Sequence, residues 1–157
     1  MVLNFETIYR DVQVAQIATS LKLNKNIVES IIVGYVSYLK KHLEEGETVK
    51  FLNVCYLRVN GQDESSHKTL AYICTELSKD FGVSSNVIYR VLTSFEEYLI
   101  SDLQNMYTYC IRGLINIRLE KNTKGEYRVR TKKSTIYNGL PIYVTTMGSF
   151  KRRVEIL

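Results

Sequence analysis

The sequence of 157 residues has no tryptophan, one proline and eight glycines. Collagen-like and low-complexity disordered chains need much more proline and glycine, so both classes are excluded. No apolar run reaches the roughly 18 residues of a membrane-spanning helix. The first residues, MVLNFETIYRD, lack the basic start and apolar core of a secretory signal, so we expect a cytoplasmic site of synthesis.

Cysteine and histidine are also scarce. The three cysteines, Cys55, Cys74 and Cys110, form no Cys-x-x-Cys pair, and with two histidines, His42 and His67, they do not predict a zinc site. Each cysteine lies in an apolar run, which indicates a reduced and buried side chain. The sequence contains no glycine-rich phosphate loop and no convincing Ser/His/Asp set. We therefore predict no catalytic, cofactor-binding or metal-binding residues and no enzyme activity.

Two pairs of adjacent glutamates could suggest acid–base chemistry. They are Glu44–Glu45 and Glu96–Glu97, and both fall in predicted helices. Neighbouring helical residues project about 100° apart, so such pairs do not converge on a substrate. We expect both pairs to lie on solvated helix faces.

Positive charge is unevenly distributed along the chain, whose net charge is +5. Residues 1–66 and 67–119 are close to neutral, whereas residues 120–157 carry nine Lys and Arg against three Asp and Glu. A nucleic acid or another anionic partner would be attracted mainly to this last segment. The candidate contact residues are Lys121, Lys124, Arg128, Arg130, Lys132, Lys133, Lys151, Arg152 and Arg153.

The stretch 24–59 recurs as 84–119 with no gap, so that position 24 aligns with 84 and position 59 with 119. We call this pairing of positions the repeat alignment. Six positions are identical, and the apolar positions keep their type, as in Ile31/Val91, Tyr35/Phe95 and Leu57/Ile117. A single alignment fits a long helix and the strand after it, which favours an internal repeat over two unrelated amphipathic helices.

Apolar spacing and capping residues predict the elements. Helices are expected over residues 12–21, 24–45, 69–81 and 84–105, with Asn24 and Ser84 as N-caps and Gly46 as a C-terminal stop. Residues 48–59 and 107–120 predict strands or hairpins, and 140–146 another strand. A ribbon is expected from residues 115–121 and 126–132 around a Lys124–Gly125 tip. The fold class is α+β, with units at 1–62 and 67–157 that pack as one body.

The order of these elements resembles the HU/IHF family of small dimeric DNA-bending proteins. The resemblance covers residues 12–157 and rests on Leu23-Asn24-Lys25 between two helices, on Gly46-Glu47-Thr48-Val49 before a strand, and on Phe150-Lys151 near the C-terminus. It implies two HU/IHF-like repeats in one chain, the second with an extended β-ribbon, that bury their long helices against each other as a pseudo-dimer.

The chain departs from the family at its DNA-bending device. Family members carry an Arg-Asn-Pro element at the arm tip, where the proline wedges between base pairs. Here the first arm is replaced by residues 60–66 with two acidic side chains, and the one proline, Pro141, lies well beyond the predicted ribbon tip. The resemblance therefore implies that paired-arm intercalation is lost.

Two functions remain open. The first is a structural virion protein, similar to the IHF-like proteins encoded among virion genes of crAss-like tailed phages. It would act as a ring or connector component at the portal–tail junction, with a homo-oligomeric ring, portal and tail as partners and with no membrane. The second is an architectural DNA-binding protein that uses the basic segment. A helix-turn-helix over residues 13–33 is disfavoured because its second helix is too apolar to read bases.

Overall fold

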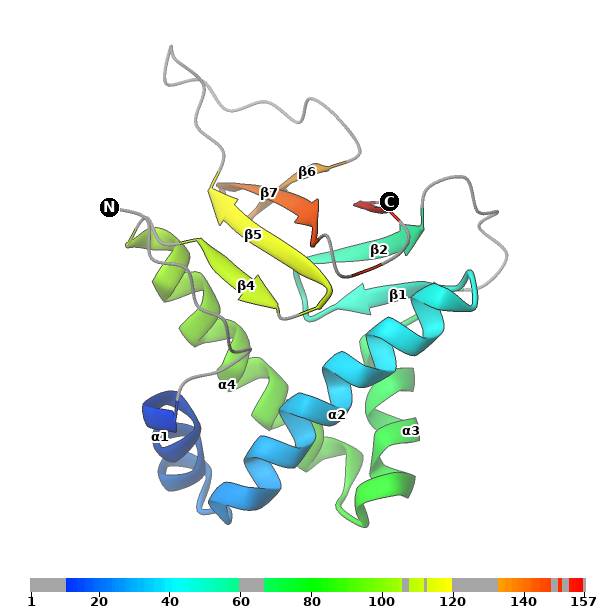
Figure 1. Cartoon of the computed structure of the whole chain (residues 1–157). Helices are drawn as coiled ribbons and strands as arrows, with labels where there is room; N and C mark the ends of the chain where they lie inside the picture. The colour runs from blue at the N-terminus through cyan, green and yellow to red at the C-terminus, as the bar shows by residue number, and fades with distance from the viewer. Residues whose placement is uncertain are drawn as a thin grey trace.

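The computed structural model describes residues 11–59, 67–105, 108–111, 113–119, 133–147, 150 and 153–156. These residues form four helices and two four-stranded sheets, which confirms the prediction of an α+β fold. Both sheets lie on the same side of the helices (Figure 1). The helices are α1 (Asp11–Leu21), α2 (Lys25–Glu44), α3 (Leu70–Phe81) and α4 (Ser85–Gln104). No helix in the described part of the chain has the length and apolar character needed to cross a bilayer.

The first sheet has the strand order β3-β1-β2-β8, and the second has the order β4-β5-β7-β6. The strands are β1 (Thr48–Phe51), β2 (Cys55–Val59), β3 (His67–Lys68), β4 (Tyr109–Ile111), β5 (Ile115–Leu119), β6 (Ser134–Tyr137), β7 (Leu140–Thr146) and β8 (Val154–Ile156). β1 and β3 are parallel, and all other neighbouring strands are antiparallel.

Local signals in the sequence account for the ends of the long helices. The side chain of Asn24 accepts a hydrogen bond from the Asn26 amide, and Ser84 accepts one from the Val87 amide, so both predicted N-caps are confirmed. Gly46 follows α2 with a φ of 85°, a left-handed conformation that glycine adopts without a Cβ clash, which confirms the predicted stop.

One apolar core runs between the helices and the sheets. The apolar stripe of α2 that begins at Val28 is buried throughout, whereas the preceding apolar residue, Ile27, is 38% exposed. α4 contributes the corresponding stripe, and the inward-facing residues of both sheets complete the core. α1 contacts both α2 and α4, and α3 also contacts both long helices.

Elements in the second half of the chain follow those of the first in the repeat alignment. It places both ends of α2 on the ends of α4, and both ends of β2 on the ends of β5. All the buried positions of α2 are buried again in α4. The hairpin register also recurs, because Val49 pairs with Leu57 and Tyr109 pairs with Ile117.

Three strands were not predicted from the sequence. β3 and β6 lie in stretches to which the sequence analysis assigned no element, and β8 lies in the basic segment near the C-terminus. β8 pairs with β2, so residues near the C-terminus complete the sheet of the first half. β7 matches the predicted strand 140–146. Most of the predicted ribbon, residues 120–132, lies outside the described residues.

Candidate functional site

The predicted basic contact residues fall largely outside the described part of the chain. This applies to Lys121, Lys124, Arg128, Arg130, Lys132, Lys151 and Arg152. Lys133 is half-buried immediately before β6, and its carbonyl accepts a hydrogen bond from the Val144 amide at 2.8 Å. Arg153 is exposed immediately before β8. The two described residues therefore lie next to strands of different sheets.

On the face of the first sheet that is turned away from the core, two basic side chains contact a tyrosine ring and a glutamate carboxylate. Side chains alternate between the two faces of a strand, so Tyr56 and Arg58 point away from the buried face of β2. The Lys50 Nζ lies 4.5 Å from the centre of the Tyr56 ring. The Arg58 Nε donates to Glu155 Oε1 at 2.8 Å, across strands β2 and β8. The glutamate offsets the positive charge of Arg58 on this face.

The second sheet has an arginine at the equivalent outward position. Arg118, which the repeat alignment pairs with Arg58, is exposed on β5. Its guanidinium carbon lies 4.4 Å from the centre of the Tyr143 ring on β7, a cation–π contact. The two outward faces therefore share an arginine position but differ in the partner that holds it.

Tyr35 joins α2 to the turn between β1 and β2. Its hydroxyl donates to the Lys50 carbonyl at 2.7 Å and accepts from the Leu52 amide at 2.6 Å. Leu52 has a φ of 49°, an uncommon left-handed conformation for a side chain of its size. Burial raises the pKa of the Tyr35 hydroxyl well above its ordinary value, so the group stays protonated and keeps both hydrogen bonds.

Glu96 is a second buried polar residue that connects separate elements by hydrogen bonds. The prediction that it lies on a solvated helix face is wrong. Its side chain is in the buried stripe of α4, 6% exposed. Oε1 accepts from the Asn53 amide at 2.7 Å, and Oε2 accepts from the Tyr137 hydroxyl. Glu96 therefore ties α4 both to the β1–β2 turn and to β6. The sequence contained a signal for this, because the repeat alignment pairs Glu96 with the buried Val36.

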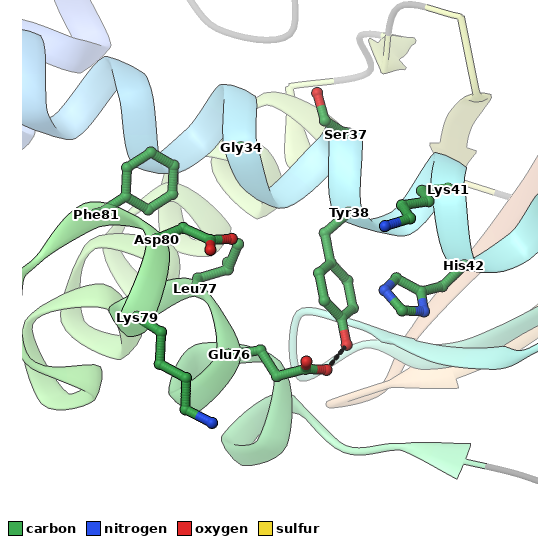
Figure 2. A pocket seen from close by; sticks show the side chains of 10 residues that line it. All are labelled: Gly34, Ser37, Tyr38, Lys41, His42, Glu76, Leu77, Lys79, Asp80 and Phe81. Atoms are coloured by element: carbon green, nitrogen blue, oxygen red, sulfur yellow. Dashed lines mark hydrogen bonds between the residues drawn. The ribbon is translucent and has the colours of Figure 1, made fainter.

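A cleft of about 500 Å³ lies between α2 and α3 (Figure 2). Apolar, hydroxyl and charged groups of both signs line it: Gly34, Ser37, Tyr38, Lys41, His42, Glu76, Leu77, Lys79, Asp80 and Phe81. Figure 2 shows the Tyr38 side chain reaching from α2 to the Glu76 carboxylate on α3, to which its hydroxyl donates at 2.5 Å. Burial and this hydrogen bond both raise the pKa of Tyr38.

The cleft between α1 and α4 corresponds to it in the repeat alignment. It is about 290 Å³ in volume and is lined by Ile17, Ser20, Ser94, Glu97, Tyr98 and Ser101. The repeat alignment, extended to the short helices, pairs each of these residues with a lining residue of the α2–α3 cleft. Lys41 in the first cleft corresponds to Ser101 in the second, and Asp80 corresponds to Ser20. The two clefts therefore have lining residues at corresponding positions of the repeat alignment, but the charges of those residues differ.

A charged cluster lies where α2 ends beside the α2–α3 cleft. The Nδ1 of His42 donates to Glu47 Oε2 at 2.5 Å and lies 3.8 Å from Glu45 Oε2. The Tyr38 ring stacks on the imidazole, with centres 3.9 Å apart. Lys68 Nζ on β3 lies 3.9 Å from Glu47 Oε2. The cluster joins the end of α2 to the start of β1 and to β3.

The three cysteines are reduced, with no disulfide among the described residues. Cys55 and Cys74 are buried as predicted, whereas Cys110 is half-buried on β4. Burial raises the pKa of Cys55 to about 12 and that of Cys74 to about 11. Both of these thiols are therefore protonated and unreactive near neutral pH.

Comparisons with protein families and with curated proteins find no match to this chain. The function must therefore be argued from the geometry and from the sequence. Sequence reasoning missed the hydrogen bonds of Tyr35 and Glu96 and the cluster around His42, because each depends on residues brought together from different elements. For the His42 cluster, the one local signal was the spacing of His42, Glu45 and Glu47 around Gly46.

Proposed function

We propose that this chain is a non-enzymatic structural protein of a tailed-phage virion, a ring or connector component at the portal–tail junction built from two HU/IHF-like repeats. The observation that carries the repeat is that element bounds, buried positions and hairpin register all coincide in one repeat alignment. The virion setting rests on the resemblance described in the sequence analysis.

The exchanged packing of the short helices supports the pseudo-dimer. α1 contacts α4 as well as α2, and α3 contacts α2 as well as α4. The short helix of each half therefore packs against the long helix of the other half. The apolar stripes of α2 and α4 are buried within one chain. A single HU/IHF-like unit would leave such a stripe in water and would need a second chain to cover it.

The placement of the polar side chains supports a scaffold. Tyr35, Glu96, Tyr38 and Arg58 are each hydrogen-bonded to a residue of another element. These groups fix the relative positions of helices and strands, which suits a protein whose task is to hold a shape. On the surface, Ile136 on β6 is 50% exposed, and an edge strand with an exposed apolar residue can pair with another copy.

Assembly can be tested directly by mass photometry and negative-stain electron microscopy over a range of concentrations. We expect closed rings, and we expect Ile136→Lys to shift the distribution towards single chains. Val33→Lys is the matched control, since Val33 is 40% exposed but lies on α2. A chain that stays monomeric at every concentration, alone and with portal and tail proteins, would contradict the proposal.

A specific observation favours architectural DNA binding as a second candidate. Arg58 and Arg118 occupy equivalent positions on the two sheets, with Arg118 exposed and the Arg58 side chain 13% exposed, and Lys50 and Arg118 lie over tyrosine rings. Against it, Glu155 offsets the charge of Arg58. Fluorescence anisotropy with a random duplex at two salt concentrations separates the candidates. DNA binding requires affinity that falls steeply with salt and weakens in Arg118→Ala.

A further inference from the structure

Three potential metal ligands meet at the C-terminal end of α2. The Nδ1 of His42 and one carboxylate oxygen each of Glu45 and Glu47 all lie within 4.8 Å of one another. The donor set is one imidazole nitrogen and two carboxylate oxygens. A tetrahedral zinc ion bound at about 2.0–2.2 Å requires donor atoms about 3.3 Å apart. The His42–Glu47 separation of 2.5 Å has to widen and the His42–Glu45 separation of 3.8 Å has to narrow, both by less than about 1 Å.

The backbone at the helix end sets this geometry. The Gly46 amide donates to the Leu43 carbonyl at 3.0 Å, and the Glu47 amide donates to the His42 carbonyl at 2.9 Å. Together these two hydrogen bonds form a Schellman motif, which turns the chain back on itself and brings Glu47 beside His42. Glu45 lies three residues after His42, which places it on the same side of the last turn.

The surroundings orient the ligands and favour a cation. Tyr38 stacks on the His42 ring, and its own hydroxyl is held by Glu76, so the imidazole is supported from one side. Carbonyl groups at the end of a helix carry a partial negative charge, which attracts cations. His42 and Glu47 have side chains 15% and 27% exposed, whereas Glu45, at 50%, remains open to solvent. An ion could therefore enter past Glu45.

We propose that His42, Glu45 and Glu47 bind a zinc-class divalent cation, with water at the fourth position. An imidazole ligand favours zinc over magnesium and calcium, which prefer all-oxygen sites with more ligands. For Nδ1 to bind the metal, the proton that it donates to Glu47 must be released to water, or move to Nε2 when the ring is neutral, so that the bound imidazole carries its proton on Nε2. The site does not depend on the proposed function.

Lys68 is the competing cation. Its Nζ lies 3.9 Å from Glu47 Oε2 and 4.6 Å from the centre of the Tyr72 ring. A metal ion and the Lys68 ammonium would repel each other across the shared carboxylate. Removal of the lysine charge should therefore strengthen metal binding, which a merely structural His42–Glu47 contact does not predict.

Competition with a chromogenic zinc chelator, using the full chain at neutral pH, tests the site. We expect one zinc ion per chain, about tenfold weaker binding in Glu45→Gln, and tighter binding in Lys68→Met. Glu44→Gln is the matched control for Glu45→Gln. The Glu44 carboxylate is adjacent in sequence but is not part of the three-ligand group. His67→Gln, which changes the histidine outside the three-ligand group, is a second control. Neither control should change the affinity.

Glu45→Gln removes an exposed ligand, so circular dichroism should show an unchanged fold and a zinc-free unfolding midpoint close to that of the wild type. Absence of saturable zinc binding, or equal affinities for Glu45→Gln and Glu44→Gln, would overturn the proposal. Cobalt substitution provides a second readout. An intense sulfur-to-cobalt absorption would place the metal on the cysteines instead and would equally overturn the site. Magnesium should not compete with zinc.

Discussion

At the scale of single residues, the turn between β1 and β2 depends on a hydroxyl group from a helix. Leu52 is fully buried in a left-handed conformation, and its amide has the Tyr35 hydroxyl as its partner. In the repeat alignment, the place of Tyr35 is taken by Phe95, which has no hydroxyl. The first turn therefore has an anchor that the corresponding phenylalanine cannot supply.

Replacement of Tyr35 by phenylalanine should lower the free energy of unfolding by about 1–3 kcal/mol. The ring still fills its place in the core, but the Leu52 amide and the Lys50 carbonyl lose a partner in a buried site. Urea denaturation of both proteins measures the difference. Tyr89→Phe is the control, because Tyr89 is 41% exposed, and it should change stability by less than about 0.5 kcal/mol. Equal effects of the two substitutions would contradict the anchor role.

At the scale of elements, the α2–α3 contact depends on a small residue facing a large one. A Cβ added at Gly34 would clash with the Cζ of the Phe81 ring, so the helices could keep their positions only if the ring moved. At the equivalent positions of the second pair, Ser94 replaces the glycine and Leu21 replaces the phenylalanine. The α2–α3 pair therefore combines a very small residue with a large ring, whereas the α4–α1 pair combines two side chains of more similar size.

A double-mutant cycle should reveal this coupling. Gly34→Ala alone should destabilise the chain by about 1–3 kcal/mol through overpacking against Phe81. In a Phe81→Leu background the clash is relieved, and the higher helix propensity of alanine should make Gly34→Ala stabilising by up to about 1 kcal/mol. Thermal or urea unfolding of the four proteins gives the interaction energy. Additive effects would show that the ring and the glycine do not constrain each other.

The sequence predicted the helices well because capping residues and apolar spacing act locally. The predicted ranges 24–45 and 84–105 differ from α2 and α4 by one residue at each end. β8 was missed because Val154–Ile156 is short and follows basic residues, and its strand conformation depends on pairing with β2. Glu96 was assigned to solvent because its partners, Asn53 and Tyr137, are distant in sequence. Of the predicted basic contact residues, only Lys133 and Arg153 lie in the part of the chain that the structure describes, so the contact prediction stays a prediction.

At the scale of the whole molecule, buried protonated groups set the response to alkali. Burial raises the pKa of Cys55 to about 12 and of Cys74 to about 11, and burial together with Glu96 raises that of Tyr137 to about 12. Ordinary values are 9.0 for cysteine and 10.0 for tyrosine. Well below pH 9 all three groups are neutral in both the folded and unfolded states, so they do not affect stability there.

Stability should therefore begin to fall as the pH approaches 9 and continue to fall above it. The unfolded chain loses protons that the folded chain retains, which favours unfolding progressively until the folded-state pKa values of about 11 and 12 are passed. Urea denaturation at pH 8, 9 and 10 measures the decline. The double variant Cys55→Ala/Cys74→Ala will be less stable overall but should show a shallower slope. An identical slope in both proteins would contradict the assignment to the thiols.

The strand β8 has a consequence for how the protein is made. Arg58 and Glu155, which pair across β2 and β8, are 97 residues apart in the chain. During translation the β1–β2 hairpin leaves the ribosome long before β8 has been made, so the backbone groups on one side of β2 have no strand partner until residues 154–156 follow. Closing so long a loop is slow. The nascent chain therefore passes through a stage at which β2 can pair with a strand of another nascent chain, and the pairing of β8 with β2 ends that exposure.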